Sequence, residues 1–206
     1  VYIGGHGDEA RFVPPPPSVV PYAMENIETY IKSGGIYQPL IDIGLVHYQF
    51  EAVHPFRDGN GRMGRLLIML MMVADDLLPE PYLYPSSFFN RNREEYTDRL
   101  VAVSRDGAWE EWLTFFLRGI SHQAREAFAR GSELLDLRDE YRDRYQDAAN
   151  SVSHLSLEIF THPYLTVTEA KEMLDMTYNT ANTAVSRLEE DGVLEEITGQ
   201  HRNRVF

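Results

Sequence analysis

Residues 54–65 read HPFRDGNGRMGR, a stretch that gathers several groups able to bind a phosphate or move a proton. The Gly-Asn-Gly turn at 59–61 consists of residues that tolerate positive φ, so its successive backbone N–H groups can form a nest for an anion. A helix that begins at about the second glycine points its positive end at the same place. Arg62 and Arg65 lie three residues apart on one face of that helix. These features predict a cradle for a polyphosphate.

Two side chains beside this cradle have the right chemistry for the remaining roles. Asp58 precedes the turn, and Mg²⁺ usually takes one or two carboxylates together with phosphate oxygens. His54 is the side chain of this stretch that is suited to act as a general base near neutral pH. Phe56, between them, is expected to anchor the loop in the core. The alternative is a buried helix–loop–helix turn with a structural histidine and a surface Asp/Arg cluster.

The segments on both sides of this stretch are expected to be helices that hold it in place. Upstream, apolar positions recur at helical spacing over residues 39–53, and downstream, residues 66–74 are all apolar. This pattern predicts a helix, a loop, and a second helix that is buried on most of its faces. His47 lies on the apolar side of the first helix, so we interpret it as a core histidine rather than a ligand.

The stretch matches, at every defining position, the motif of the Fic (Fido) family, His-x-Phe-x-Asp/Glu-Gly-Asn-Gly-Arg-x-x-Arg, and the first 130 residues also resemble that family. The resemblance implies an α-helical enzyme that transfers AMP from ATP to a Ser, Thr or Tyr hydroxyl of a target protein. By position it implies that His54 deprotonates the target hydroxyl and that Asp58 binds Mg²⁺. It also implies that Arg62 binds the β-phosphate and that Arg65 binds the γ-phosphate. The nucleotide-binding residues that it implies are Gly59, Asn60, Gly61, Arg62 and Arg65.

Two further expectations rest on the resemblance. Tyr96 lies in a predicted helix that runs to about residue 104, and we expect it near the adenine or ribose; packing in the core is the alternative. Residues 1–13 have two β-leaning ends around a Gly- and Asp-rich turn, which predicts a hairpin. In the family, a hairpin flap at this place pairs with the backbone of the target segment. An ordinary edge hairpin is the alternative.

No inhibitory segment of the family is recognisable in the sequence. Many members carry a helix with the pattern Ser/Thr-x-x-x-Glu-Gly/Asn, whose Glu pairs with the last Arg of the motif, here Arg65. Glu25 is the one Glu followed by Gly or Asn, and Pro21 stands four residues before it. Because the chain opens abruptly and without Met, we expect that helix upstream or on a separate partner. We also identify no Glu near the phosphates, which would have favoured a hydrolytic reaction.

Composition narrows the class of protein. The 206 residues are 43% hydrophobic, include no cysteine and carry a net charge of −13. The charge argues against a broad nucleic-acid surface, and the absence of cysteine excludes disulfides. No apolar run reaches the length of a membrane span. We therefore expect a cytoplasmic protein without a membrane partner.

Residues 131–150 are highly charged and are expected to form a connector helix after a helix over 106–130. Residues 151–206 then read as a short helix, a capped helix from Thr166 with Glu169 three residues later, and a third helix over 179–191. Alternating segments at 193–198 and 203–206 fit a β-wing. This order resembles a winged helix-turn-helix domain. It holds nine acidic and four basic residues, so DNA binding, protein binding and dimerisation all stay open.

The sequence thus predicts a mainly α protein, a Fic-type helical bundle over 1–130 with a short N-terminal β-hairpin flap, followed by a small winged helix-turn-helix domain. The expected function is protein AMP transfer with Mg²⁺ and ATP. Removal of AMP, or transfer from another nucleotide, is one alternative. A nucleotide-sensing, DNA-binding regulator is another, although the intact His54 argues against it because a sensor needs no base.

Overall fold

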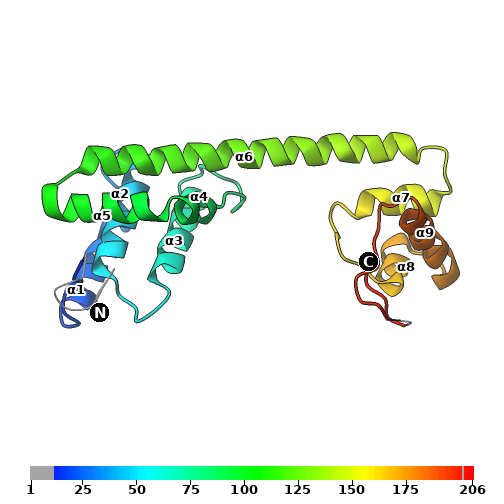
Figure 1. Cartoon of the computed structure of the whole chain (residues 1–206), viewed down its shortest axis with the longest axis horizontal. Helices are drawn as coiled ribbons and strands as arrows, with labels where there is room; N and C mark the ends of the chain where they lie inside the picture. The colour runs from blue at the N-terminus through cyan, green and yellow to red at the C-terminus, as the bar shows by residue number, and fades with distance from the viewer. Residues whose placement is uncertain (1–11, 201) are drawn as a thin grey trace. The chain divides into compact units, whose positions relative to one another are not determined.

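The structure of the chain is a computed structural model that describes residues 12–200 and 202–206 (Figure 1). The described residues are mainly helical, as the sequence predicts, and the chain divides into two compact units, Val1–Phe128 and Ala129–Phe206. The hairpin flap predicted at residues 1–13 falls almost wholly outside the described residues, so it stays a prediction.

The first unit is a bundle of helices joined by short connections. In order, they are α1 (Val20–Lys32), α2 (Pro39–Val53), α3 (Asn60–Ala74), α4 (Pro85–Arg91), α5 (Arg93–Asp106) and the first part of α6 (Trp109–Arg144). A proline stands within the first two positions of α1, α2 and α4, where its missing N–H costs no helical hydrogen bond. The helix predicted over 39–53 is confirmed at both ends by α2.

Helix α2 is the central element of this unit, buried on most of its faces. Its neighbours include α1, α3 and α5, and Trp112 of α6 donates its indole N–H to the carbonyl of Gly44 at 3.0 Å. His47 is 1% exposed and lies among aromatic rings whose centroids are 5.9 to 6.2 Å away. Burial lowers the pKa of His47 to about 3, so the ring is neutral. The interpretation of His47 as a core histidine is therefore confirmed.

Helix α6 is a single helix of 36 residues, whereas the sequence suggested a break near residue 130 and a separate connector helix over 131–150. A lone glycine, Gly131, marks the expected break, but one glycine in a helix costs only about 1 kcal/mol. The backbone is helical through Arg144, turns at 145–147, and enters α7 at Asn150.

The second unit packs the end of α6 with α7 (Asn150–Glu158), α8 (Val167–Leu174) and α9 (Tyr178–Glu190). The capping box predicted before α8 is confirmed: Thr166 Oγ1 accepts from the Glu169 N–H, and the Glu169 carboxylate accepts from the Thr166 N–H. Fully buried small and branched side chains hold the helices together: Leu155, Leu165, Ala170, Ala181, Ala184, Val185 and Leu188.

The β-wing expected after α9 is not confirmed in the described part of this unit. Leu165 and Phe206 exchange two backbone hydrogen bonds of 3.0 and 2.9 Å, and Ile197 donates to Val205 at 3.0 Å, but residues 193–198 form no strand. The Glu196 carboxylate accepts from the N–H groups of the next two turn residues, 198 and 199. Such local bonds compete with a strand ladder, so the winged helix-turn-helix assignment stays a prediction.

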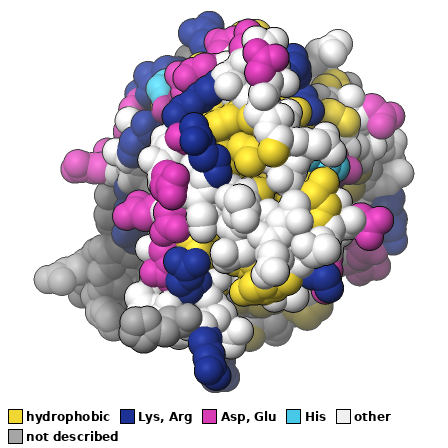
Figure 2. All heavy atoms as spheres, turned by 90° about the vertical axis from the view of Figure 1, so that its right-hand side faces the viewer, with side chains coloured by type: hydrophobic (Ala, Val, Ile, Leu, Met, Phe, Trp, Pro, Cys, Tyr) yellow, Lys and Arg dark blue, Asp and Glu magenta, His cyan; other side chains and the backbone are white. Residues whose placement is uncertain are grey.

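Two surface properties bear on partners. Within the described residues, no helix combines the length and apolar composition needed to cross a bilayer. On the face that Figure 2 shows, Lys and Arg side chains are interspersed with Asp and Glu side chains rather than gathered into one basic patch.

Candidate functional site

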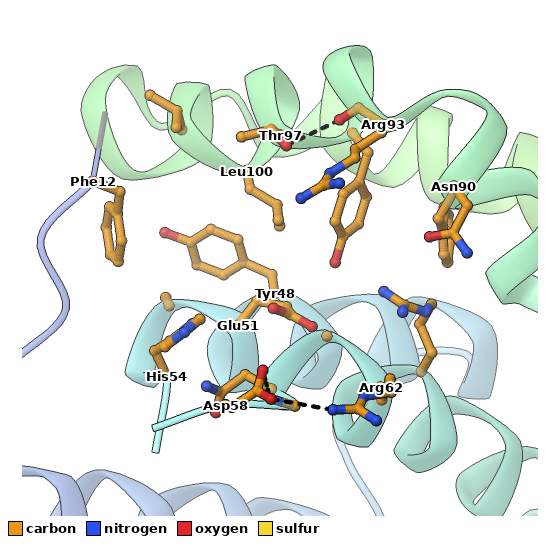
Figure 3. Close-up of a pocket in the computed structure, with 18 of the residues that line it drawn as sticks. Phe12, Tyr48, Glu51, His54, Asp58, Arg62, Asn90, Arg93, Thr97 and Leu100 are labelled. Atoms are coloured by element: carbon orange, nitrogen blue, oxygen red, sulfur yellow. Dashed lines mark hydrogen bonds and ion pairs between the residues drawn. The ribbon is translucent and has the colours of Figure 1, made fainter. Parts of the chain in front are cut away.

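The residues singled out by the sequence line one cavity of about 420 Å³, formed between α2, α3 and α5 (Figure 3). They are His54, Asp58, Gly59, Asn60, Gly61, Arg62, Arg65 and Tyr96. The structure therefore brings together positions that span 43 residues of sequence, as a shared nucleotide site requires.

His54 ends α2 and turns its ring toward the cavity. Its backbone lies in the left-handed region, with φ 50° and ψ 56°, a conformation uncommon for residues other than glycine. Its N–H still donates to the Phe50 carbonyl at 3.0 Å. Burial lowers the pKa of His54, and the nearby Glu51 carbonyl acts in the opposite direction. The ring is therefore neutral near pH 7 and available to accept a proton.

The loop after His54 leads into a helix start that suits an anion. Gly59 has φ 83° and donates its N–H to Asp58 Oδ1 at 2.7 Å. Helix α3 then begins at Asn60 with no side-chain cap and no acidic residue in its first turn. The N–H groups of that turn have no partner within the helix, so they and the helix dipole favour a bound phosphate.

The resemblance implies that Asn60 binds the nucleotide, but in this structure its side chain binds the backbone of the preceding loop. It is 2% exposed, and both of its polar side-chain atoms bind the backbone of Phe56, each at 2.8 Å. Asn60 thus fixes the loop that carries Asp58, while its backbone N–H belongs to the first turn of α3. The expectation that Phe56 lies in the core is wrong, because its side chain is 45% exposed. The two hydrogen bonds from Asn60, rather than apolar burial of Phe56, hold this part of the loop.

The two arginines of the motif are held by different contacts. Arg62 forms an exposed ion pair with Asp58 at 3.4 Å (dashed in Figure 3), a type of pair that contributes little to stability and can be exchanged for a ligand. Arg65 donates its Nε–H to Ser86 Oγ of α4 at 3.0 Å. A Cβ on Gly61 would stand 2.9 Å from Nη1 of Arg65, so the glycine leaves room for the guanidinium beside the helix start.

The donor set fits a magnesium ion that is shared with a nucleotide. No cluster of three or more His, Asp or Glu side chains is present among the residues that the structure describes. Asp58 offers one exposed carboxylate next to the phosphate cradle. Mg²⁺ keeps several waters and takes its other ligands from phosphates, so Asp58 is a suitable protein ligand for the metal of a metal–nucleotide complex.

Tyr96 lies at the inner wall of the cavity, and most of its surface is buried. It is 8% exposed, and its hydroxyl forms a hydrogen bond of 2.9 Å with Nε2 of His47. Burial and the adjacent Glu51 carboxylate both raise the pKa of Tyr96. Tyr96 is thus both a core residue and a cavity residue, and its contact with a nucleotide stays a proposal.

Sequence reasoning missed several polar residues of the cavity, among them Tyr48, Glu51, Asn90 and Arg93 (Figure 3). The statement that no Glu lies near the phosphate cradle is wrong, since Glu51 is there. Its spacing was a usable signal, because Glu51 and His54 are three apart and share one helix face. Arg93 lies three residues before Tyr96, at the start of the helix from which only Tyr96 was selected. Tyr48 and Asn90 carried no signal beyond their place on helices.

Comparisons with known proteins point to one family. Residues 4–72 match the Fic/DOC family. A probable protein adenylyltransferase of Aquifex aeolicus is 36% identical over 91 residues, which is 44% of this chain and 26% of that protein. Protein adenylyltransferase Fic of Aedes aegypti is 31% identical over 118 residues, 56% of this chain and 21% of that protein. The chain thus spans about a quarter of the length of these relatives.

A solved structure supports the fold. The crystal structure of a Fic family protein from Desulfovibrio desulfuricans aligns with 93% of this chain and 56% of its own, with a TM-score of 0.54 and 23% identity. At this identity the likeness concerns the fold alone. The match to the Fic/DOC family model covers residues 4–72, about a third of the chain, and contains the whole of the motif at 54–65.

Proposed function

We propose that this chain transfers AMP from Mg·ATP to a Ser, Thr or Tyr hydroxyl of a target protein. The observation that carries the proposal is the arrangement of one cavity: the neutral ring of His54 at the end of α2 shares it with the uncapped start of α3 and with Arg62 and Arg65. One base beside a phosphate cradle is what transfer to a hydroxyl needs.

The transfer step uses few protein groups. His54 takes the proton of the target hydroxyl, whose oxygen forms a bond to the α-phosphorus of ATP. The bond from that phosphorus to the bridging oxygen breaks, and pyrophosphate leaves. The first-turn N–H groups of α3, with Arg62 and Arg65, hold the phosphates in line and offset their charge. Mg²⁺, when bound at Asp58, would neutralise further negative charge on the phosphates.

The names of the relatives agree with this proposal, since both curated proteins are called protein adenylyltransferases. They cover only part of this chain, and the chain covers only part of them. We assign the target-binding role to the flap at residues 1–13 on the resemblance alone. The second unit is proposed as a winged helix-turn-helix module that binds DNA or a protein, or that forms a homodimer.

The test is a labelling experiment that distinguishes which phosphate is transferred. The protein is incubated with Mg²⁺, an acceptor lysate, and ATP labelled at either the α- or the γ-phosphorus. Because kinases in the lysate also transfer the γ-phosphate, each reaction is compared with the same lysate lacking the protein. The proposal predicts that the protein increases the label from α-labelled ATP and not the label from γ-labelled ATP. An increase from the γ-position alone would identify a phosphotransferase, and no increase from either position would remove the transferase proposal.

Glu51 gives specific support to one second candidate, the removal of AMP from a modified protein. Apart from His54, Glu51 is a group in the cavity that can accept a proton near neutral pH, since burial raises its pKa to about 7. Such a group can activate a water molecule. Release of AMP from an AMP-modified protein, lost in Glu51→Gln and independent of ATP, would favour this candidate over transfer.

A further inference from the structure

A second hollow of about 680 Å³ lies between α1 and α3, and we call it the α1–α3 groove. Its lining comes from residues 21–32 of α1 and 63–70 of α3, together with Phe50 and Phe56. None of these residues lines the nucleotide cavity, although α3 contributes to both hollows. The groove is therefore a surface distinct from the candidate nucleotide site.

The groove exposes a contiguous set of large apolar side chains. Met63, Leu66 and Leu70 lie three and four residues apart on one face of α3, and with Phe56 they are 44 to 58% exposed. Helices α1 and α3 each pack on α2, and Phe50 of α2 is a buried core residue in the groove. Because proteins seldom leave such a patch open to water, the groove has the character of a contact surface.

The shape of the groove suits a helix better than a small molecule. It is bounded by two helices of 13 and 15 residues, each about 20 Å long. A third helix laid along them would place its apolar side chains between α1 and α3. Small-molecule sites instead combine apolar walls with buried polar groups that orient the ligand. Within the described residues, the buried polar side-chain atoms that lack a partner all lie outside the groove.

The charges along the groove specify the sign of a partner. All of them lie on the α1 side: Glu25, Glu28 and Lys32. Lys32 pairs with Glu28 at 2.5 Å, whereas the exposed Glu25 forms no ion pair with any residue that the structure describes. This side of the groove is therefore net negative, in a chain of net charge −13. Charge complementarity favours a partner with basic side chains beside its apolar face.

We propose that the α1–α3 groove docks an amphipathic helix of a separate protein, whose apolar face fills the groove and whose Lys or Arg side chains lie along Glu25 and Glu28. This inference goes beyond the proposed function and does not depend on AMP transfer. Since the groove and the nucleotide cavity share no lining residue, the partner helix and a nucleotide can be bound at the same time.

The probe for the test is selected from a display library of helix-forming peptides of about 15 residues, a length that matches the two helices of the groove. The full chain is the bait. We expect the enriched sequences to share apolar residues at the i, i+3 or i+4, and i+7 positions, with Lys or Arg beside them. No enrichment, or enrichment of sequences with acidic flanks, would overturn the proposal.

Two exposed leucines show whether an enriched peptide lies in the groove. Leu70 lines it and is 58% exposed, whereas Leu135 of α6 lies outside it and is 61% exposed, so aspartate at either position should leave the protein folded. Fluorescence anisotropy with the labelled peptide should show a Kd at least about tenfold higher for Leu70→Asp and an unchanged Kd for Leu135→Asp. Equal Kd values for the two variants would overturn the proposal.

A charge reversal tests the role of the acidic side. Glu25→Lys should raise the Kd of the basic peptide roughly two- to fivefold, as expected for an exposed ion pair, and the same peptide with Glu in place of its Lys and Arg should prefer this variant to the wild type. Glu133→Lys, which changes an exposed residue of α6 outside the groove, should behave as the wild type. An unchanged Kd for Glu25→Lys would overturn the assignment of a basic partner.

Two further measurements exclude other occupants and other sites. Sedimentation velocity without peptide should give the same species for the wild type and Leu70→Asp. A wild-type dimer that is lost in Leu70→Asp would show that a second copy covers the groove, and would overturn the proposal of a separate partner. An ATP analogue with Mg²⁺ should not displace the peptide. Displacement would place the peptide in the nucleotide cavity and would also overturn the proposal, whereas a failure of AMP transfer would leave it standing.

Discussion

The Asn60 side chain bridges the loop to the start of α3 through two hydrogen bonds with Phe56. Oδ1 accepts from the Phe56 N–H and Nδ2 donates to the Phe56 carbonyl, each at 2.8 Å. Since Asp58 and Gly59 lie inside this bridge, the position of the metal ligand and of the phosphate cradle depends on it.

Asn60→Ala should therefore lower both stability and nucleotide affinity. It leaves two backbone groups of Phe56 without partners, which predicts a loss of about 1–3 kcal/mol in the free energy of unfolding. Asn92→Ala is the control, because Asn92 makes a single side-chain bond, to the Phe88 carbonyl. Urea titrations should show the larger loss for Asn60→Ala. A loss no greater than that of the control would contradict the bridge.

The contact between Arg65 and Ser86 predicts an effect on binding without an effect on folding. Ser86→Ala removes the acceptor of the Arg65 Nε–H, so the guanidinium is less well ordered. The apparent Kd for an ATP analogue should rise roughly three- to tenfold. Ser87→Ala, which instead affects Arg91, should leave binding unchanged. Equal Kd values for the two variants would show that Ser86 does not order Arg65.

Alanine substitutions at Gly59 and Gly107 can distinguish the effect of backbone strain on stability from an effect on nucleotide binding. Gly59 and Gly107 both have positive φ, 83° and 69°, so alanine at either should cost about 1 kcal/mol of stability. Only Gly59 lines the cavity. Thermal unfolding should report similar losses for the two variants, whereas nucleotide titration should report weaker binding for Gly59→Ala alone. Intact binding by Gly59→Ala would place the nucleotide elsewhere.

His47 and Glu51 should give the stability of the first unit two opposing dependences on pH. The pKa of His47 is lowered from 6.5 to about 3, so between these values the unfolded chain binds the extra proton and stability rises with pH. The pKa of Glu51 is raised from 4.5 to about 7, so between these values the folded chain holds the extra proton and stability falls as the pH rises.

Over the shared range from pH 4.5 to 6.5, the two slopes oppose each other in the wild type. Glu51→Gln removes one of them, so its urea midpoint should rise with pH more steeply than that of the wild type. Glu110→Gln, which changes an exposed residue of α6 outside the cavity, is the control and should follow the wild type. Parallel curves for Glu51→Gln and the wild type would show that Glu51 ionises in the folded protein as it does in the unfolded chain.

The sequence predicted the ends of several helices correctly, because helix ends depend on the residues next to them in the chain. The proline near the start of α2 and the left-handed residue at its end bound that helix, and the Thr166–Glu169 box caps α8. The length of α6 was missed because a glycine in a helix is a weak signal when the turns on both sides are strongly helical. The alternating pattern at 193–198 predicted a strand that is not present, because the Glu196 side chain instead accepts hydrogen bonds from the backbone of the following turn.

The motif predicted which residues share the site, since positions 54–65 are close in sequence and bounded by two helices. It did not predict what each side chain contacts. The bridge from Asn60 to Phe56 depends on the loop conformation, and the place of Glu51 depends on the packing of α2 against Gly64 of α3. Both relations are tertiary, so residue type and spacing alone do not specify them.

The central claim is that His54 acts on the acceptor hydroxyl and not in holding the nucleotide. The most direct measurement compares the wild type with His54→Ala in two assays, binding of an ATP analogue and transfer of label from α-labelled ATP to protein. We predict that binding changes by less than about threefold while transfer falls by at least about 100-fold, the lower range for loss of a general base. Transfer that persists in His54→Ala would contradict the account.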